Sequence, residues 1–328
     1  MNTQTTIIFG TGPLGLSVMD ALIERGYGRI TLVNRSGKAS ETLPAGVRIV
    51  AGDATDPAQV AAIVSGADVV FHCAQPGYMN WPKQFPGITN GILNGVIQAR
   101  VPRLVFGDNL YMYGPTGGKP VHEGLPYSAQ GHKGRTRAAM AQTLLDAHRA
   151  GRVKVAIGRA ADFYGPRVLG SALGDRVFPA VLQGKAASVM GNPDLPHTYT
   201  YIKDFGRSLV TLAENEAAFG KAWHVPNAET LSTRQFLKIA YQLAGKQPKI
   251  EAAGKVMLQI VGLFVPVVKE MLEIFYEFNE AYVVDHGPFD KAFGAHPTPT
   301  KQAIEETLAW YSTLDEKTAL HGQPVTEG

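Results

Sequence analysis

The sequence predicts an α/β protein: a Rossmann-type, doubly wound parallel sheet with a smaller C-terminal lobe. Through the first half of the chain, short β-rich segments alternate with helical patterns. This alternation is typical of a parallel sheet covered by helices on both faces. A glycine-rich turn also joins the first expected strand to the first expected helix. Both observations favour the same fold class.

The expected elements follow in order along the first half. Strands are predicted at residues 6–9, 29–33, 47–51, 68–73, 103–107 and 153–159, and helices at 14–25, 57–64, 85–99 and 134–150. Gly26 stands where a C-terminal helix cap is expected, and Pro57 follows Asp56 as a first-turn proline after an N-cap. These end signals support the helix boundaries.

From about residue 166 the pattern changes to longer loops and separate helices. We expect Asp204 to cap a helix that runs to residue 214. Ser232 and Gln235 have the spacing of a capping box, and Thr300 is expected to start the last helix. The change of pattern predicts a second structural region after residue 166.

Composition restricts the possible functions. The chain has 328 residues, of which 45% are hydrophobic and 18% charged, and its net charge is +3. No basic run stands out, so a nucleic-acid surface is not expected. The single cysteine, Cys73, excludes an internal disulfide and fits a reducing compartment. With no signal-peptide pattern at the N-terminus, we expect a cytoplasmic protein that needs no metal.

The longest apolar stretch covers residues 256–268 and is interrupted by Gln259, Gly262 and Pro266. It is too short and too interrupted to span a bilayer. We expect an amphipathic or buried helix here. Contact with a membrane surface and a homodimer face are the alternatives.

The glycine turn has the spacing of a phosphate-binding loop. Gly10 permits the tight turn, Gly12 lets the backbone approach a pyrophosphate, and Gly15 lets the helix pack closely on the strand. Pro13 and Leu14 open the helix, whose free N–H groups and dipole favour an anion. The alternative is that the glycines serve only the turn.

The end of the second strand carries no carboxylate for a ribose 2′-hydroxyl. Instead it offers Asn34, Arg35 and Ser36, with Lys38 nearby, which suit a 2′-phosphate. NADP(H) is therefore favoured, and NAD(H) remains possible if Arg35 is only a solvated surface residue and Asn34 serves the ribose.

Further cofactor contacts are expected at the ends of the third and fourth strands. Asp53 and Ala54 are placed near the adenine; Cys73, Ala74 and Gln75 are placed near the nicotinamide ribose. Cys73 has no evident base beside it and is expected to be an apolar filler. We expect an NAD(P)-binding domain over residues 1–165, with 198–222 packing back on it, and a mainly substrate-binding lobe over 166–328.

Several segments, taken in their order along the chain, resemble the extended short-chain dehydrogenase/reductases of the NAD-dependent epimerase/dehydratase family. They are Gly-Asp-Ala-Thr-Asp at 52–56, the fifth strand with Tyr-Gly-Pro at 104–115, Arg…Tyr-Gly-Pro at 159–166, the segment 197–204, and the C-terminal region 285–311. The resemblance covers most of the chain and implies the Rossmann fold, a nicotinamide cofactor and a small-molecule substrate.

Four departures from the family pattern affect the expected chemistry. Phe9 stands where the family's glycine loop usually starts, and Asn109 stands at its catalytic Ser or Thr. Lys133 and Arg137 stand at its Tyr-x-x-x-Lys pair. His197 stands at its substrate-phosphate Arg, which argues against a nucleotide-sugar substrate because a bidentate clamp is missing.

A reductase without that tyrosine still needs a proton donor for the developing oxyanion. We expect Asn109, Tyr111 and Lys133 to surround the reacting polar atom, with Lys133 also close to the cofactor. His132 is a further candidate acid, whereas Tyr113 is expected to be structural. The alternative for Lys133 is a lysine that begins a helix and faces water.

The substrate wall is expected to be partly aromatic. A loop at residues 77–82 follows the fourth strand, where strand ends face the ligand crevice of such folds. This loop forms either part of the pocket or a small core of its own. The candidate substrate residues are Tyr78, Trp81, Asp162, Phe163, His197 and Tyr199.

Three functions remain open at this point. The first is an NADP(H)-dependent oxidoreductase that reduces a small carbonyl or activated alkene with a non-standard catalytic set. The second is a sugar-type epimerase or dehydratase that uses its cofactor transiently. The third is a non-catalytic NADP(H)-sensing protein. A homodimer is possible in each case.

Overall fold

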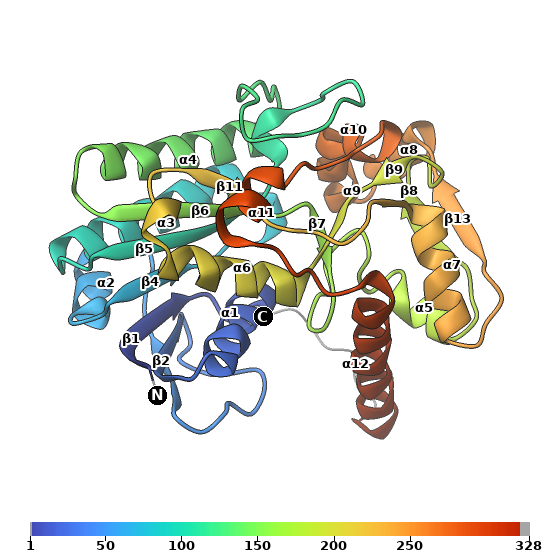
Figure 1. The fold of residues 1–328 in the computed structure, drawn as a ribbon. Coiled ribbons are helices and arrows are strands. Elements are labelled where there is room, and N and C mark those ends of the chain that lie inside the picture. The colour runs from blue at the N-terminus through green and yellow to red at the C-terminus, as the bar shows by residue number, and fades with distance from the viewer. Residues whose placement is uncertain (1, 322–328) are drawn as a thin grey trace.

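A parallel seven-stranded sheet forms the larger part of the computed structural model, which describes residues 2–321 (Figure 1). Its strand order is β11-β6-β5-β4-β1-β2-β3. The strands are β1 (Asn2–Phe9), β2 (Tyr27–Asn34), β3 (Val47–Ala51), β4 (Val69–His72), β5 (Arg103–Asp108), β6 (Lys154–Arg159) and β11 (Ala222–His224). The six strands expected in the first half are confirmed, and the reversal of strand order falls between β1 and β4.

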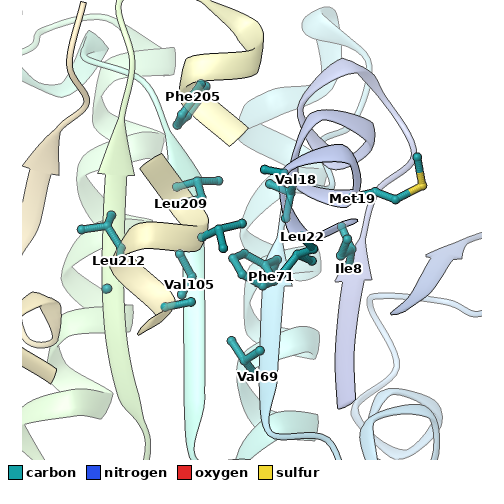
Figure 2. Packing of buried hydrophobic residues seen from close by; sticks show 14 of the residues in the cluster. Ile8, Val18, Met19, Leu22, Val69, Phe71, Val105, Phe205, Leu209 and Leu212 are labelled. Atoms are coloured by element: carbon teal, nitrogen blue, oxygen red, sulfur yellow. The ribbon is translucent and has the colours of Figure 1, made fainter. Parts of the chain in front are cut away.

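Helices cover both faces of this sheet. One face carries α1 (Pro13–Glu24) and α6 (Ile202–Glu214); the other carries α2 (Pro57–Val64), α3 (Trp81–Gln98) and α4 (His132–Arg149). Figure 2 shows Phe205, Leu209 and Leu212 of α6 beside Val18 and Leu22 of α1 over the strands. Burial of such side chains is the main stabilising contribution to the layer.

Two helix ends illustrate how local sequence sets the boundaries. Asp56 accepts hydrogen bonds from the backbone N–H groups of Ala58 and Gln59, so α2 begins as expected. The helix α3 begins at Trp81, four residues earlier than expected, because Pro82 suits a first helical turn.

The chain segment after residue 201 returns to the sheet. Gly206 of α6 lies so close to α1 that an added Cβ would lie 2.5 Å from the carbonyl oxygen of Ser17. After α6, β11 pairs in parallel with β6 at the sheet edge. The division of the chain into domains at residue 165 stays a prediction.

The C-terminal lobe contains three small two-stranded sheets. They pair β7 (Asp162–Tyr164) with β10 (Tyr199–Tyr201), β8 (Ala187–Met190) with β13 (Ile250–Ala253), and β9 (Pro196–His197) with β12 (Leu231–Ser232). The described helices of the lobe are α5 (Phe178–Leu182), α7 (Thr233–Leu243), α8 (Lys255–Gly262), α9 (Pro266–Met271), α10 (Tyr276–Asn279), α11 (Gly287–Phe293) and α12 (Thr300–His321). The predicted capping box of Ser232 and Gln235 starts α7, and α12 starts at Thr300 as expected.

One expectation for this half is wrong, and a second is right only in part. Asp204 does not cap α6, because the helix already begins at Ile202; its carboxylate instead accepts hydrogen bonds from the N–H and hydroxyl of Thr298, both at 2.8 Å. The stretch 256–268, expected as an amphipathic or buried helix, has one buried and one exposed side, so the buried alternative is wrong. It forms α8, a turn and the start of α9, with much of its apolar surface exposed.

His224 fixes β11 to the rest of the sheet edge. Its Nδ1–H donates to the carbonyl of Asp285 at 3.0 Å, so Nε2 accepts from the hydroxyl of Tyr113 at 2.9 Å. That hydroxyl also accepts from Arg159 at 2.6 Å. Burial, with a smaller contribution from the Arg159 cation, lowers the pKa of His224 to about 3.

This burial predicts an acid-dependent loss of stability. Below about pH 6.5 the unfolded chain protonates His224 and the folded chain does not, so stability falls until about pH 3. His224→Gln should reduce the slope of unfolding free energy against pH by about 1.4 kcal/mol per unit between roughly pH 6 and 4. Urea denaturation measures this. His296→Gln, at an exposed position, should leave the slope unchanged; equal slopes for all three proteins would contradict the prediction.

Candidate functional site

The glycine turn between β1 and α1 has the geometry of a phosphate cradle. Gly10 has φ +102° and lies against the fourth-strand end, where its Cβ would be 2.7 Å from the Cys73 carbonyl oxygen. A Cβ on Gly15 would be 2.0 Å from the Gly10 carbonyl oxygen. At Gly12, no atom of the described residues lies within 4 Å of the Cβ position. The space before the α1 N-terminus, at Pro13 and Leu14, is therefore open.

The loop after β2 is organised by Asn34. Its amide nitrogen donates to the Thr11 hydroxyl and the Lys38 carbonyl, both at 2.9 Å, and its amide oxygen accepts from the Gly37 N–H at 2.7 Å. Asn34 thus ties this loop to the glycine turn. The side chains of Arg35 and Lys38 are exposed beside it.

Ser36 and Asp53 complete the adenosine side of the candidate site. Ser36 donates to the amide oxygen of Asn34 at 3.2 Å. The carboxylate of Asp53 accepts from the Thr55 hydroxyl at 2.7 Å and N–H at 2.9 Å; these bonds, with a smaller contribution from Arg35, lower the pKa of Asp53. Ala54 follows at the end of β3, where its carbonyl oxygen would lie 2.2 Å from a Cβ on Gly91 of α3.

The end of β4 brings Cys73, Ala74 and Gln75 against the glycine turn. The N–H of Cys73 donates to the Phe9 carbonyl at 2.8 Å. Burial raises the pKa of the Cys73 thiol, so the thiolate needed for nucleophilic chemistry is disfavoured. The predicted cofactor residues thus share one edge of the sheet, at the carboxyl ends of β1 to β4.

Lys133 is completely buried, with 0% exposure. The alternative that it faces water at the start of a helix is therefore wrong. Its ammonium forms an ion pair with Glu270 of α9 and lies 4.5 Å from the centre of the Tyr78 ring. Its backbone N–H donates to the Glu273 carboxylate at 2.6 Å. The C-terminal lobe therefore supplies the counter-charge for this helix end.

Arg137 lies one turn further along α4 and is also buried, with 3% exposure. Its guanidinium bonds the Asp108 carboxylate at 3.2 Å and lies 4.2 Å from the Trp81 ring centre and 4.3 Å from that of Phe85. Burial lowers the pKa of Arg137, and the Asp108 charge opposes this shift. Trp81, a candidate substrate residue, is mainly a core residue that supports this cation.

Tyr111 stacks on Trp81 with ring centres 5.9 Å apart. Burial raises the pKa values of both Tyr111 and Tyr78. The nearby Tyr78 phenol raises the pKa of Tyr111 further. Asn109 accepts the Tyr111 N–H at 3.3 Å, so it shapes the turn that presents this tyrosine. The structure therefore brings Lys133, Tyr78 and Tyr111 together.

A buried carboxyl group faces these tyrosines. Glu277 of α10 is buried, and its Oε1 has no hydrogen-bond partner among the residues described. Burial raises its pKa well above the usual range, and the nearby Asp162 raises it further, whereas the hydroxyls of Tyr282 and Tyr276 lower it. Burial thus favours the neutral form of the Glu277 carboxyl group.

His197 is a structural anchor rather than an open contact. It is 3% exposed, with Nε2 2.9 Å from the Asp162 carboxylate and Nδ1 3.1 Å from the Glu277 carbonyl oxygen. Its ring stacks on Tyr199 at 4.4 Å and on Phe278 at 5.0 Å. Its ring nitrogens are therefore occupied within the protein.

The other candidates make separate contacts or face solvent. Phe163 packs against the core beneath α6, with its ring centre 6.4 Å from that of Phe205. The Tyr199 hydroxyl bonds Thr233 at 2.8 Å. His132 is exposed, and Tyr113 is held by His224 and Arg159 as a packing residue.

Sequence reasoning missed the carboxylates that complete the site. Glu270, Glu273 and Glu277 are spaced three and four residues apart, as on one face of a helix, and this spacing in an apolar region was an available signal. The sequence marked Asp108 only as part of the fifth-strand segment that resembles the family and did not predict its ion pairs. Among the side chains described, residues 3–314, no group of three or more His, Cys, Asp or Glu could hold a metal ion.

Known proteins resemble this chain along most of its length. The sequence model of the NAD dependent epimerase/dehydratase family matches residues 7–225. Sterol-4-alpha-carboxylate 3-dehydrogenase, decarboxylating, of Mus musculus is 26% identical over 338 residues, covering 95% of this chain and 91% of that protein. The 3beta-hydroxysteroid-dehydrogenase/decarboxylase isoform 1 of Arabidopsis thaliana is 24% identical, covering 89% and 72%.

Solved structures share the fold at lower identity. UDP-glucuronic acid 4-epimerase from Bacillus cereus in complex with NAD has a TM-score of 0.76 at 16% identity, covering 95% of this chain and 99% of its own. The dTDP-glucose 4,6-dehydratase DesIV from Streptomyces venezuelae has a TM-score of 0.78 at 17% identity, covering 97% and 98%. Because the family model spans more than half of the sequence, the chain belongs to the NAD-dependent epimerase/dehydratase family, within the NAD(P)-dependent enzymes of the extended short-chain dehydrogenase/reductase superfamily.

Proposed function

We propose that this protein is an NADP(H)-dependent oxidoreductase that interconverts a hydroxyl and a carbonyl group on a largely apolar substrate. The observation that carries the proposal is the buried Lys133 ammonium at the position of the family's catalytic tyrosine, beside Tyr78 and Tyr111. The two steroid dehydrogenases among its relatives support this reaction class.

The cofactor half of the site fits a dinucleotide. The open space at Gly12 lies before the α1 N-terminus, where free N–H groups and the helix dipole favour a pyrophosphate. Arg35 and Lys38 are exposed beside the Asn34 loop and are suited to bind a 2′-phosphate. The bound nicotinamide would supply or accept the hydride.

Lys133 supplies the positive charge that the reacting oxygen requires. An ammonium held in a site shielded from water stabilises a developing oxyanion more strongly than it would in solvent. Lys133 is ion-paired with Glu270, whose side chain is partly exposed. We therefore expect the substrate oxygen to take the place of this carboxylate when Glu270 moves away.

Tyr111 is the proton donor in this proposal. Burial keeps its pKa high, so the phenol stays protonated at neutral pH. An alkoxide is a stronger base than a phenolate, so such a tyrosine can still protonate the product of carbonyl reduction. The buried Glu277 carboxyl group, whose pKa is raised by burial, lies near enough to Tyr111 to raise the pKa of its phenol as well.

The surroundings favour an apolar substrate over a nucleotide sugar. Tyr78 and Tyr111 supply aromatic surface near Lys133, and the buried Trp81 ring packs against both. At the position of the family's phosphate-binding Arg, the His197 side chain is engaged by Asp162 and by backbone. A sugar-type epimerase is therefore less well supported, although the fold is shared with such enzymes.

Oxidative decarboxylation is a second candidate reaction. Both steroid relatives carry decarboxylation in their names. The ion pair of Lys133 with Glu270 shows that this buried cation accommodates a carboxylate. A substrate with a carboxylate beside its hydroxyl could exchange with Glu270 at Lys133.

The glycine turn predicts that one glycine substitution weakens cofactor binding and another weakens the fold. Gly12→Ala should fold normally, because its φ of −76° suits alanine, yet bind NADPH at least about tenfold more weakly since the methyl group enters the phosphate space. Gly15→Ala should lose about 1–3 kcal/mol of stability through the clash with Gly10. Calorimetric NADPH binding and thermal unfolding measure the two effects. Unchanged affinity in folded Gly12→Ala would remove the glycine turn from the cofactor site.

The cofactor preference depends on Arg35. Arg35→Ala should weaken NADPH binding by about ten- to a hundredfold while changing NADH binding little, because one charge-assisted contact to a 2′-phosphate is lost. Fluorescence titration with both cofactors measures the ratio. Exposed Arg29 on β2 provides the control, and Arg29→Ala should keep the wild-type ratio. An unchanged ratio in Arg35→Ala would overturn the assignment.

Turnover depends on Lys133. The wild type should oxidise a 3-hydroxysteroid, with or without a 4-carboxylate, or reduce the matching ketone. Lys133→Met should lower kcat by about a hundredfold or more, because the developing oxyanion loses its positive charge. Absorbance at the nicotinamide band measures turnover. Arg135→Met, on the exposed face of the same helix, should retain activity. Tight NADPH binding without turnover across hydroxysteroids, ketones and enones would instead support a sensing protein.

A further inference from the structure

The α8–α9 hairpin leaves a continuous apolar surface open to solvent. Its turn residues Leu263 and Phe264 are 79% and 81% exposed. The other exposed apolar side chains of this segment are Val256, Met257, Ile260, Val265 and Val267. Scattered exposed apolar residues are normal, but a contiguous group of this size marks an interaction surface.

The hairpin is nevertheless well packed on its inner side. Leu258 and Val268 are buried with Phe275 in a separate small core. Gly262 closes the hairpin, since its Cβ position lies 3.2 Å from the backbone of Lys269. The hairpin is thus apolar on two sides, and its outer side is not needed to hold the fold of the described residues.

Charge distinguishes between the possible occupants of this surface. Lys255 and Lys269 stand at the two ends of the segment, both exposed, and no acidic residue lies between them. In a two-fold contact between copies of the hairpin, residues 255–269 would offer these lysines no acidic partner. A bilayer surface with anionic lipids instead pairs with both lysines while the apolar tip enters the interface.

We propose that the α8–α9 hairpin docks on the surface of membranes that contain anionic lipids. The segment lies on the C-terminal lobe, far from the β2–β3 edge of the sheet (Figure 1). Insertion is peripheral: no helix within residues 2–321 is long and apolar enough to cross a membrane.

The docking surface adjoins the candidate site. The same segment continues into Glu270 and Glu273, which contact the side chain and the N–H of Lys133. The helix α9 also contacts the short turn that begins at Tyr78. If the proposed function holds, an apolar substrate dissolved in the bilayer would reach Lys133 beside the docked hairpin.

Co-sedimentation with vesicles tests the proposal without any turnover. The full chain should bind vesicles of phosphatidylcholine with one quarter phosphatidylglycerol at least about tenfold more strongly than phosphatidylcholine alone, and salt should reduce the difference. The double variant Leu263→Ser/Phe264→Ser should lose at least about tenfold in partitioning. Ile23→Ser, a partly exposed apolar residue on α1, is the control and should bind as the wild type.

Two further readouts separate the explanations. Lys255→Gln/Lys269→Gln should lose the preference for anionic vesicles, and every variant should keep the wild-type NADPH affinity as a check of folding. Sedimentation equilibrium gives the oligomeric state. If the protein binds neither kind of vesicle, the proposal is overturned. It is also overturned if the wild type is a dimer that dissociates in the Leu263→Ser/Phe264→Ser variant, because the apolar surface would then be the contact between two copies. Vesicle binding without steroid turnover supports docking and rejects only the proposed reaction.

Discussion

The buried carboxylate of Asp108 holds together the edge of the sheet that carries the candidate site. It stands at the end of β5 and accepts from Arg137 of α4 at 3.2 Å and from Arg159 at the end of β6 at 3.3 Å. Removing one partner of a buried ion pair leaves an uncompensated charge and typically costs about 3–5 kcal/mol. Asp108 thereby fixes α4 against the sheet and sets the position of Lys133 one turn before Arg137. Through Arg159 it also orders Tyr113, which in turn holds His224 of β11.

One carboxylate cannot neutralise two guanidinium groups, and aromatic rings provide the remaining stabilisation. Trp81 and Phe85 face Arg137 at 4.2 and 4.3 Å, within the range of cation–π attraction. The hydroxyls of Tyr113 and Tyr127 accept from Arg159, both at 2.6 Å. The aromatic loop after β4 is therefore packed as core around Arg137, and its role as a wall of a substrate pocket stays a proposal. The two alternatives that the sequence left open for this loop are not exclusive.

Local signals predicted most of the fold, because they depend on neighbouring residues. The glycine turn, the cap at Asp56 and the capping box at Ser232 each need only a few adjacent positions. The candidate site could be predicted only for its cofactor half, which lies in the first βαβ units. Lys133 resembles a solvated helix start until Glu270, 137 residues later, is placed beside it. Asp204 likewise binds Thr298, 94 residues away, instead of capping its own helix. Such tertiary contacts override local preference and leave little trace in one sequence.

The buried arginines and the buried lysine of α4 differ in how their counter-charges are held. The cations Arg137 and Arg159 are fixed by Asp108 within the large sheet, where α4 packs on the strands. The carboxylate that balances Lys133 belongs to α9, a short helix whose inner contacts form only a small core and whose preceding turn is exposed. A displacement of the hairpin would therefore separate Glu270 from Lys133 while leaving the Asp108 ion pairs in place. Because a buried ammonium without a counter-charge is costly, the vacated position would favour an anionic or strongly polar oxygen. The same local movement would expose the site and create its affinity for a reacting oxygen.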